Sequence, residues 1–152
     1  MKNHLIKLVL LFLVFISLTL SPFKIILVQG SSMYPTLKNN QILIGMATKN
    51  FQKNDVVVAN IEDNFIVKRI KYTAGEHFYY YLNYDVDSPI LINKDFYEHF
   101  EASDKVHIVQ ENVVENNKYY LIGDNLNLSD DSRRFGCVDK NSIKYKIIFP
   151  RL

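Results

Sequence analysis

Residues 56–70 read Val-Val-Val-Ala-Asn-Ile-Glu-Asp-Asn-Phe-Ile-Val-Lys-Arg-Ile, and this stretch determines the class of fold that we expect. It holds two short runs rich in β-branched and aromatic side chains, 56–61 and 65–70, divided by residues that favour turns. Runs of the same kind, punctuated by Gly, Asn, Asp and Pro, recur at 25–28, 42–46, 78–82, 90–92, 106–109, 119–122 and 143–149. Nine short strands without a long helical pattern predict a mainly β body. The least regular stretch is 85–101, and the mixed segment 96–102 allows one helical turn.

The N-terminal region, residues 5–20, is far more apolar than the rest of the chain and lacks the Gly, Asn, Asp and Pro residues that divide the predicted strands. Thirteen of the sixteen residues from 5 to 20 are apolar, and the run from 8 to 16 is unbroken. A helix that is apolar on every side lacks a face for water, which is typical of a segment in contact with lipid. Such a helix would be about 24 Å long, a little short of the ~30 Å hydrocarbon core of a bilayer, and Lys7 and Lys24 could reach the two interfaces.

Two interpretations of this region are a membrane anchor and a cleavable signal peptide. The segment Ser-Pro-Phe-Lys-Ile that follows, residues 21–25, contains no small-x-small cleavage site. We therefore expect an uncleaved, single-pass anchor at 1–24 and a separate β-domain at 25–152. Lys2, Lys7 and the terminal amine favour a cytoplasmic N-terminus, which would place the body on the extracytoplasmic face of the cytoplasmic membrane.

The charge distribution argues against some functions. The chain has a formal net charge of +2, and its first 24 residues carry three lysines and no acid, so the remaining body is near neutral. A body of this kind lacks the basic surface that nucleic-acid binding needs. Cys137 is the single cysteine, so neither an internal disulfide nor a thiolate metal cluster can form. No feature suggests an obligate interface, and we expect a monomer.

Ser32 is a candidate nucleophile just past the first predicted strand of the body. A serine is a weak nucleophile unless a base activates it. Gly30 before it can adopt backbone angles that other residues avoid, which would let backbone N–H groups face a reacting carbonyl. Pro35 after it stiffens the chain. An ordinary turn of Gly, Ser and Pro is the alternative interpretation.

Lys68 is a candidate base because of its place in the strand at 65–70. Side chains alternate along a strand, so Lys68 shares a face with Ile66 and Ile70. If that face is buried, desolvation lowers the pKa of the Lys68 amine, and a neutral amine could take the serine proton. If the opposite face is buried, Lys68 stays solvated, which is the more common situation for a lysine.

The third candidate region is the polar loop at 123–136, which is bracketed by glycines. Arg133 or Arg134 could pair there with Asp124 or Asp131. The aspartate spacing does not match a calcium loop, which needs a closing Glu, so we expect no metal ion.

Four motifs then occur in order, and together they resemble the type I signal peptidases, membrane-anchored Ser/Lys proteases that trim exported preproteins. The resemblance covers nearly the whole chain apart from 79–111 and is to the bacterial or organellar branch, which carries lysine at position 68. The motifs are Ser32-Met33-x-Pro35-Thr36-Leu37; Asn54-Asp55-Val56-Val57-Val58; Val67-Lys68-Arg69-Ile70 with Ala74-Gly75-Glu76; and Tyr119-Tyr120-Leu121-Ile122-Gly123-Asp124-Asn125 followed by Ser129-x-Asp131-Ser132-Arg133-x-Phe135-Gly136. One departure is Leu126-Asn127-Leu128, where the family often has Arg-Asp-Asn.

The resemblance implies a compact antiparallel β-sheet body, preceded by one transmembrane helix, and a role for individual residues. Ser32 would be the nucleophile, Lys68 the general base, and the Ser32 N–H part of an oxyanion hole. Gly30 and Ser31 would shape that hole, with Gly30 supplying no side-chain donor to it.

Further roles follow from the same resemblance. Ser129 would hydrogen-bond and orient the Lys68 amine. Asp131 and Arg133 would form a supporting ion pair, with Asp124 in the same group. Met33 and Pro35 would bind substrate.

The implied function is removal of N-terminal signal peptides from exported preproteins by a serine endopeptidase that cuts after small residues of the Ala-x-Ala type. Its partners would be preproteins and the lipid of the cytoplasmic membrane, and it would need neither metal nor cofactor. Two alternatives stay open: a Ser/Lys processing peptidase of a pilin or conjugation system, and a non-catalytic, membrane-tethered β-domain. A cytosolic Ser/Lys autoprotease repressor fits less well, because such proteins carry a DNA-binding domain and no anchor.

Overall fold

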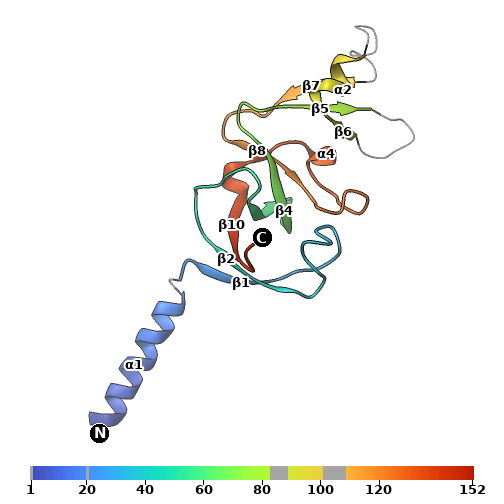
Figure 1. The fold of residues 1–152 in the computed structure, drawn as a ribbon. Coiled ribbons are helices and arrows are strands. Elements are labelled where there is room, and N and C mark those ends of the chain that lie inside the picture. Colours follow the sequence, from blue (N-terminus) through green and yellow to red (C-terminus); the bar gives the residue numbers. More distant parts are fainter. Residues whose placement is uncertain (1, 20, 83–88, 101–108) are drawn as a thin grey trace.

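The computed structural model describes residues 2–19, 21–82, 89–100 and 109–152. Figure 1 shows an N-terminal helix, a β-sheet body and a smaller sheet at the far end from the helix. The elements in chain order are α1 (Lys2–Thr19), β1 (Phe23–Leu27), β2 (Ile42–Met46), β3 (Val56–Ile61), β4 (Asn64–Thr73), β5 (His77–Tyr81), β6 (Ile90–Ile92), α2 (Lys94–Glu98), β7 (Val109–Val113), β8 (Lys118–Ile122), α4 (Ser132–Phe135), β9 (Val138–Asp139), the 3-10 helix η1 (Lys140–Ser142) and β10 (Ile143–Phe149).

The body is a seven-stranded sheet with the order β1-β2-β10-β3-β4-β8-β9, and every neighbouring pair is antiparallel. The prediction of a mainly β fold is therefore confirmed. β3 and β4 form the centre of the sheet, and their register places Val57 opposite Lys68. The pairing of β4 with β8 brings the end of β8, and the loop that follows it, beside the strand that carries Lys68.

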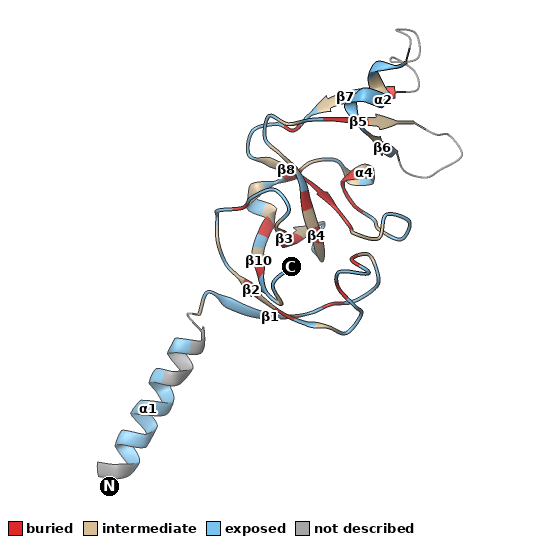
Figure 2. Cartoon of the chain, in the orientation of Figure 1, coloured by how far each residue is buried: buried red, intermediate tan, exposed pale blue. Residues whose placement is uncertain are grey.

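The core forms because the two faces of the central strands are both apolar. One face of β3 and β4 contributes Val57, Ala59 and Ile70 to a cluster with Leu121 and Ile143. The other face contributes Val56 and Val58 to a cluster that also contains Val28, Met33, Leu37, Leu43 and Ile147. Figure 2 shows buried residues along the crossing strands of the body. The turn after β1 is thus held against the sheet by its own apolar side chains.

The smaller sheet has the order β6-β5-β7 and is antiparallel. It packs on the body through an aromatic cluster in which the rings of Phe78 and Tyr120 lie 4.3 Å apart between centroids. The helical turn allowed at 96–102 corresponds to α2, which begins earlier, at Lys94, because Asn93 caps it through the Phe96 N–H. Residues 101–102, and 106–108 of the strand expected at 106–109, lie outside the described residues.

The N-terminal helix α1 stands apart from the body (Figure 1), and its described side chains from Leu5 to Leu13 are exposed. In the part of the chain that the structure describes, no helix is both long enough and apolar enough to cross a membrane. The segment expected to be a transmembrane helix, 1–24, does form a helix, α1. The described part of that helix does not reach the length and hydropathy of a membrane span.

Candidate active site

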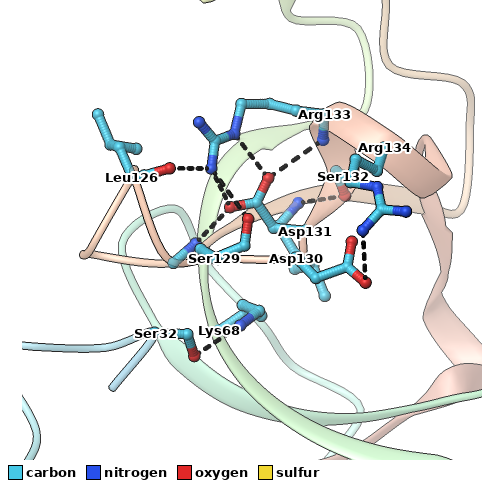
Figure 3. Close-up of polar contacts among 11 residues, drawn as sticks. Ser32, Lys68, Leu126, Ser129, Asp130, Asp131, Ser132, Arg133 and Arg134 are labelled. Atoms are coloured by element: carbon cyan, nitrogen blue, oxygen red, sulfur yellow. Dashed lines mark hydrogen bonds and ion pairs between the residues drawn. The ribbon is translucent and has the colours of Figure 1, made fainter. Parts of the chain in front are cut away.

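The structure brings the Ser32 and Lys68 side chains together, with Lys68 Nζ 2.8 Å from Ser32 Oγ. Ser32 lies in the turn that follows β1, and Lys68 lies in the middle of β4, 36 residues later in the chain. Figure 3 shows the two side chains pointing toward each other. This separation is within the range over which a base can take a proton from a hydroxyl.

Lys68 lies on the buried face of β4, the face that it shares with Ile66 and Ile70, and its exposed fraction is 3%. Burial lowers the pKa of the Lys68 amine, while the carboxylates of Asp131 and Asp130 oppose this effect and Arg133 adds to it. The result is a pKa below the ordinary value for lysine. Of the two orientations considered for this strand, the structure has the one that desolvates the amine.

The turn that carries Ser32 is fixed by a set of backbone contacts. Gly30 has a φ of +88°, in the region that glycine adopts more readily than other residues, and its N–H donates to Asn39 Oδ1 at 2.9 Å. Tyr34 N–H donates to Ser31 O at 3.0 Å, and Leu37 N–H donates to Met33 O at 2.9 Å. Among the described residues, no group accepts a hydrogen bond from the Ser32 N–H. That donor is therefore free to bind an oxygen from outside the chain.

The loop after β8 closes on this turn from the other side. Asn125 donates from its backbone N–H to Ser32 O at 2.9 Å and from its side-chain Nδ2 to Ser31 O at 3.1 Å. Gly123 is buried at the point of closest approach, where an added Cβ would lie 2.6 Å from Ser32 O and would also overlap the Ser129 side chain. The close approach of the two loops thus requires glycine at position 123.

Asp131 and Arg133 form an ion pair within the same loop. Arg133 donates to Asp131 Oδ1 from Nε at 2.8 Å and to Oδ2 from Nη2 at 3.0 Å, and Asp131 is fully buried. Burial by itself would raise the pKa of Asp131, but hydrogen bonds from Arg133 and from the Gly123 N–H help to hold it below the ordinary value. Arg133 also donates to Leu126 O at 2.7 Å and Ser129 O at 3.2 Å (Figure 3). One buried carboxylate and one arginine therefore hold the loop at 123–131.

Asp124 does not join that ion pair, which corrects the grouping expected from the sequence. Its carboxylate instead accepts two hydrogen bonds from Arg69, from Nε at 2.9 Å and from Nη2 at 2.7 Å. Burial would raise the pKa of Asp124, but hydrogen bonds from Arg69 and Thr36, together with the charges of Arg69 and Lys71, outweigh it, and the pKa is lowered. Arg69 follows Lys68 on the strand and points to the opposite face. Arg69 therefore binds the loop at 123–136 to β4 on the face opposite the Lys68 amine.

Two other residues named from the sequence, Ser129 and Met33, are placed differently from expectation. The hydrogen bond implied between Ser129 and Lys68 is not formed: the buried Ser129 Oγ instead faces the Asp131 carboxylate and helps to lower the pKa of that group. Met33 is 2% exposed and packs in the core, because the turn needs apolar side chains to bind it to the sheet. It is therefore not displayed on a surface cleft, whereas Pro35 is exposed.

Sequence reasoning missed four residues with structural roles at this site: Arg69, Asn125, Asn39 and Ser132. Ser132 is buried and its Oγ accepts the Leu121 N–H at 2.9 Å, which joins the short helix α4 to β8. Arg69 and Asn125 stand inside the motifs quoted above, and their polar side chains were the available signal. Asn39 carries no signal in the sequence, because its hydrogen bond with Gly30 forms only when the turn closes.

The arrangement offers the elements of acyl transfer without a metal ion. It provides a hydroxyl, a buried amine of lowered pKa beside it, and, at the hydroxyl-bearing residue, a backbone N–H that donates to no group in the described part of the chain. Among the described residues, no three His, Cys, Asp or Glu side chains are grouped so that they could hold a metal ion. The chemistry that fits best is attack of Ser32 on a carbonyl.

Comparisons with known proteins agree with this chemistry. Residues 1–151 match the family model described as "Signal peptidase, peptidase S26". The chain is 32% identical over 145 residues to signal peptidase IB of Staphylococcus aureus (strain Mu50 / ATCC 700699), a match that covers 80% of this chain and 74% of that protein. It is 32% identical over 121 residues to signal peptidase I S of Bacillus subtilis (strain 168), covering 70% of this chain and 64% of that protein.

A solved structure of a signal peptidase I from Enterococcus faecalis V583 superposes with a TM-score of 0.43 at 20% identity, covering 65% of this chain and 97% of that one. The family match extends over the β-body and the N-terminal helix alike. The resemblance inferred from the four motifs is confirmed, and the chain belongs to the peptidase S26 family of signal peptidases, which makes it a serine endopeptidase.

Proposed function

We propose that this chain is a membrane-anchored signal peptidase that removes signal peptides from exported preproteins, with Ser32 as the nucleophile and Lys68 as the general base. The observation that carries this proposal is the 2.8 Å separation of Lys68 Nζ and Ser32 Oγ, with the amine buried. A lysine in this setting has a lowered pKa and can hold the neutral form that a base requires.

The reaction proceeds in two stages. Neutral Lys68 takes the Ser32 proton as the serine oxygen attacks the scissile carbonyl, and the Ser32 N–H donates to the oxyanion that develops. The protonated amine then gives its proton to the leaving nitrogen, the C–N bond breaks, and the acyl group stays on Ser32. Water, deprotonated by the same amine, attacks the ester, and the amine returns the proton to Ser32 as the acid product leaves.

The substrate lies extended along an edge strand, where main-chain hydrogen bonds hold it. The outer strand β1 supports this assignment, since it is at one end of the seven-strand order and leads directly into the turn of Ser32. Small residues of the Ala-x-Ala type precede the cut, as expected for the family. The body itself acts as a monomer.

The segment 1–24 serves as the anchor, and the catalytic body lies on the extracytoplasmic face of the cytoplasmic membrane. The exposed apolar side chains of α1 from Leu5 to Leu13 support contact with lipid, because water is an unfavourable environment for a helix without a polar face. Lys2 and Lys7 near the amino terminus favour a cytoplasmic location for that end.

The proposal is tested with the full chain in detergent micelles and a preprotein that carries an Ala-x-Ala site. The expected result is a single cut after the second alanine, located by N-terminal sequencing of the product. A matched preprotein with both alanines changed to phenylalanine should remain uncut. Equal cleavage of the two preproteins, or a cut elsewhere, would contradict the proposed specificity.

A second experiment separates the peptidase from a non-catalytic β-domain. A serine-directed acylating reagent should modify Ser32 in the wild-type chain, as identified by peptide mass spectrometry. The Lys68→Ala variant should be modified far more slowly, since it lacks the base. Failure to modify Ser32 in the wild type would favour the non-catalytic alternative.

A further inference from the structure

Asn125 makes an unusual pair of contacts with the chain on either side of Ser32. Its side-chain Nδ2 donates to Ser31 O at 3.1 Å, and its backbone N–H donates to Ser32 O at 2.9 Å. One residue therefore binds both peptide groups that flank the proposed nucleophile. Nothing in the proposed reaction requires Asn125 to touch the substrate.

The geometry of the peptide bond gives these contacts a consequence. Ser31 O and the Ser32 N–H belong to the same planar, trans peptide group, so they point in opposite directions. A donor that holds Ser31 O therefore also fixes the direction of the Ser32 N–H. The Ser32 N–H has no acceptor of its own among the described residues, so the donors to Ser31 O set its orientation. Tyr34 N–H is one of these donors, at 3.0 Å, but it moves with the turn itself, whereas Asn125 Nδ2 holds Ser31 O from the loop after β8.

The loop that carries Asn125 is held in place by its own contacts, so Asn125 can fix the position of the Ser31 carbonyl. Gly123 N–H donates to the buried carboxylate of Asp131 at 3.1 Å. Arg133 binds Leu126 O at 2.7 Å, and Leu128 N–H donates to Asn125 O at 3.1 Å. The position of Asn125 is thus set by contacts that do not involve Ser32.

We propose that Asn125 is a positioning residue that aims the Ser32 N–H at the developing oxyanion. This inference rests on the proposed function. The role of Asn125 matters more in this chain because Gly30 supplies no side-chain donor to the oxyanion. Donors aimed in advance at the transition state act on kcat more than on substrate binding, since the ground-state carbonyl carries less charge.

The test compares Asn125→Ala with Asn127→Ala in the full chain. The first substitution removes the side-chain donor and keeps the backbone N–H that binds Ser32 O. The second makes the same change two residues away, at an exposed asparagine of the same loop whose side chain makes no hydrogen bond to the described residues. Losing the aim of one oxyanion donor should lower kcat by about 10- to 100-fold, somewhat less than deleting such a donor, with KM nearly unchanged.

Two more measurements distinguish a lost orientation of the Ser32 N–H from a general loss of structure at the site. A peptide boronate, which forms a tetrahedral adduct with serine, should bind Asn125→Ala more weakly by a factor similar to the loss in kcat. An uncleavable peptide of the same sequence should bind with unchanged affinity. Asn125→Asp keeps the shape of the side chain but replaces the donor by a carboxylate, so it should lose at least as much activity as Asn125→Ala.

The outcomes separate this inference from the function on which it rests. Cleavage by the wild type and by Asn127→Ala, with the kcat loss confined to the Asn125 variants, would support it. Wild-type kcat in Asn125→Ala or Asn125→Asp, or an equal loss of boronate and peptide binding, would overturn it while leaving the proposed function intact. Absence of Ser32-dependent cleavage by the wild type would overturn both.

Discussion

Lys68 lies opposite Val57 in the central strand pair of the sheet, and its amine reaches Ser32 Oγ at 2.8 Å from within the core. The base is thus carried by a central strand of the sheet, and the nucleophile is carried by a turn that the loop after β8 holds against it. Because the strand cannot move without disturbing the core, the alignment depends on the contacts that position the turn.

Activity should depend on pH through the Lys68 amine. Burial lowers its pKa, and the base works when neutral, so kcat/KM should fall as pH drops through the lowered pKa and reach a plateau above it. A pH-rate profile with a preprotein substrate measures this. An acid limb positioned at the ordinary lysine value would contradict a desolvated base.

The Asp130→Asn variant should shift that acid limb to lower pH. The carboxylate of Asp130 is one of the charges that raise the pKa of the Lys68 amine, so removing it stabilises the neutral base. Asp95→Asn, on the exposed helix α2, is the matched control and should leave the profile in place. A shift toward higher pH in Asp130→Asn would show that this charge acts in another way.

Gly123→Ala should lose activity by about a hundredfold or more. Its Cβ would lie 2.6 Å from Ser32 O, so the turn that carries the nucleophile must move, and displacements of about 1 Å can cost this much. Gly136→Ala serves as control: its φ of +78° makes the change strained, but no atom lies within 4 Å of the new Cβ. That variant should lose stability and keep kcat. Equal kcat values in the two variants would refute the steric argument.

Asp131→Asn should destabilise the fold far more than Asp130→Asn. Asp131 is fully buried and pairs with Arg133, and breaking a buried pair costs roughly 3–5 kcal/mol. Asp130 pairs with Arg134 at 3.4 Å with both side chains more than half exposed, which is worth less than about 1 kcal/mol. Urea unfolding of the two variants checks the difference, and similar midpoints would contradict it.

Lys68→Met should unfold at a higher temperature than the wild type near neutral pH, although it should be inactive. The lowered pKa means that the unfolded chain binds the proton more tightly than the folded one, so the charged lysine opposes folding. This destabilisation is fully present below the folded pKa and disappears as pH rises past the ordinary lysine value. The stabilisation of Lys68→Met should therefore shrink as pH rises from the folded pKa toward the ordinary lysine value, as thermal unfolding at several pH values can establish.

Much of the fold could be predicted from local pattern. The ranges 42–46, 56–61, 90–92 and 143–149 match strands β2, β3, β6 and β10 residue for residue, because each alternates or concentrates apolar side chains between turn formers. β9 was missed because two residues, Val138 and Asp139, are too few to show a pattern. Its existence depends on its pairing with β8.

The candidate site was predictable only where a side chain carries its own signal. A lone lysine between two isoleucines indicates an unusual environment, and Ser32 stands in a distinctive motif. The contacts of Asn125 and Asn39 depend on loops that meet only in the folded chain, so no periodicity marks them. Met33 was assigned to the substrate by resemblance, whereas in the fold its apolar side chain packs in the core with Val28 and Leu37.

The most direct test of the account is the rate of preprotein cleavage by the wild type, Ser32→Ala, Lys68→Ala and Lys71→Ala, measured side by side in detergent. Lys71 is an exposed lysine on the same strand and provides the matched control. We predict that the wild type and Lys71→Ala cleave at similar rates and that Ser32→Ala and Lys68→Ala are each slower by at least about a thousandfold. Near-normal cleavage by either Ser32→Ala or Lys68→Ala would contradict the Ser/Lys mechanism.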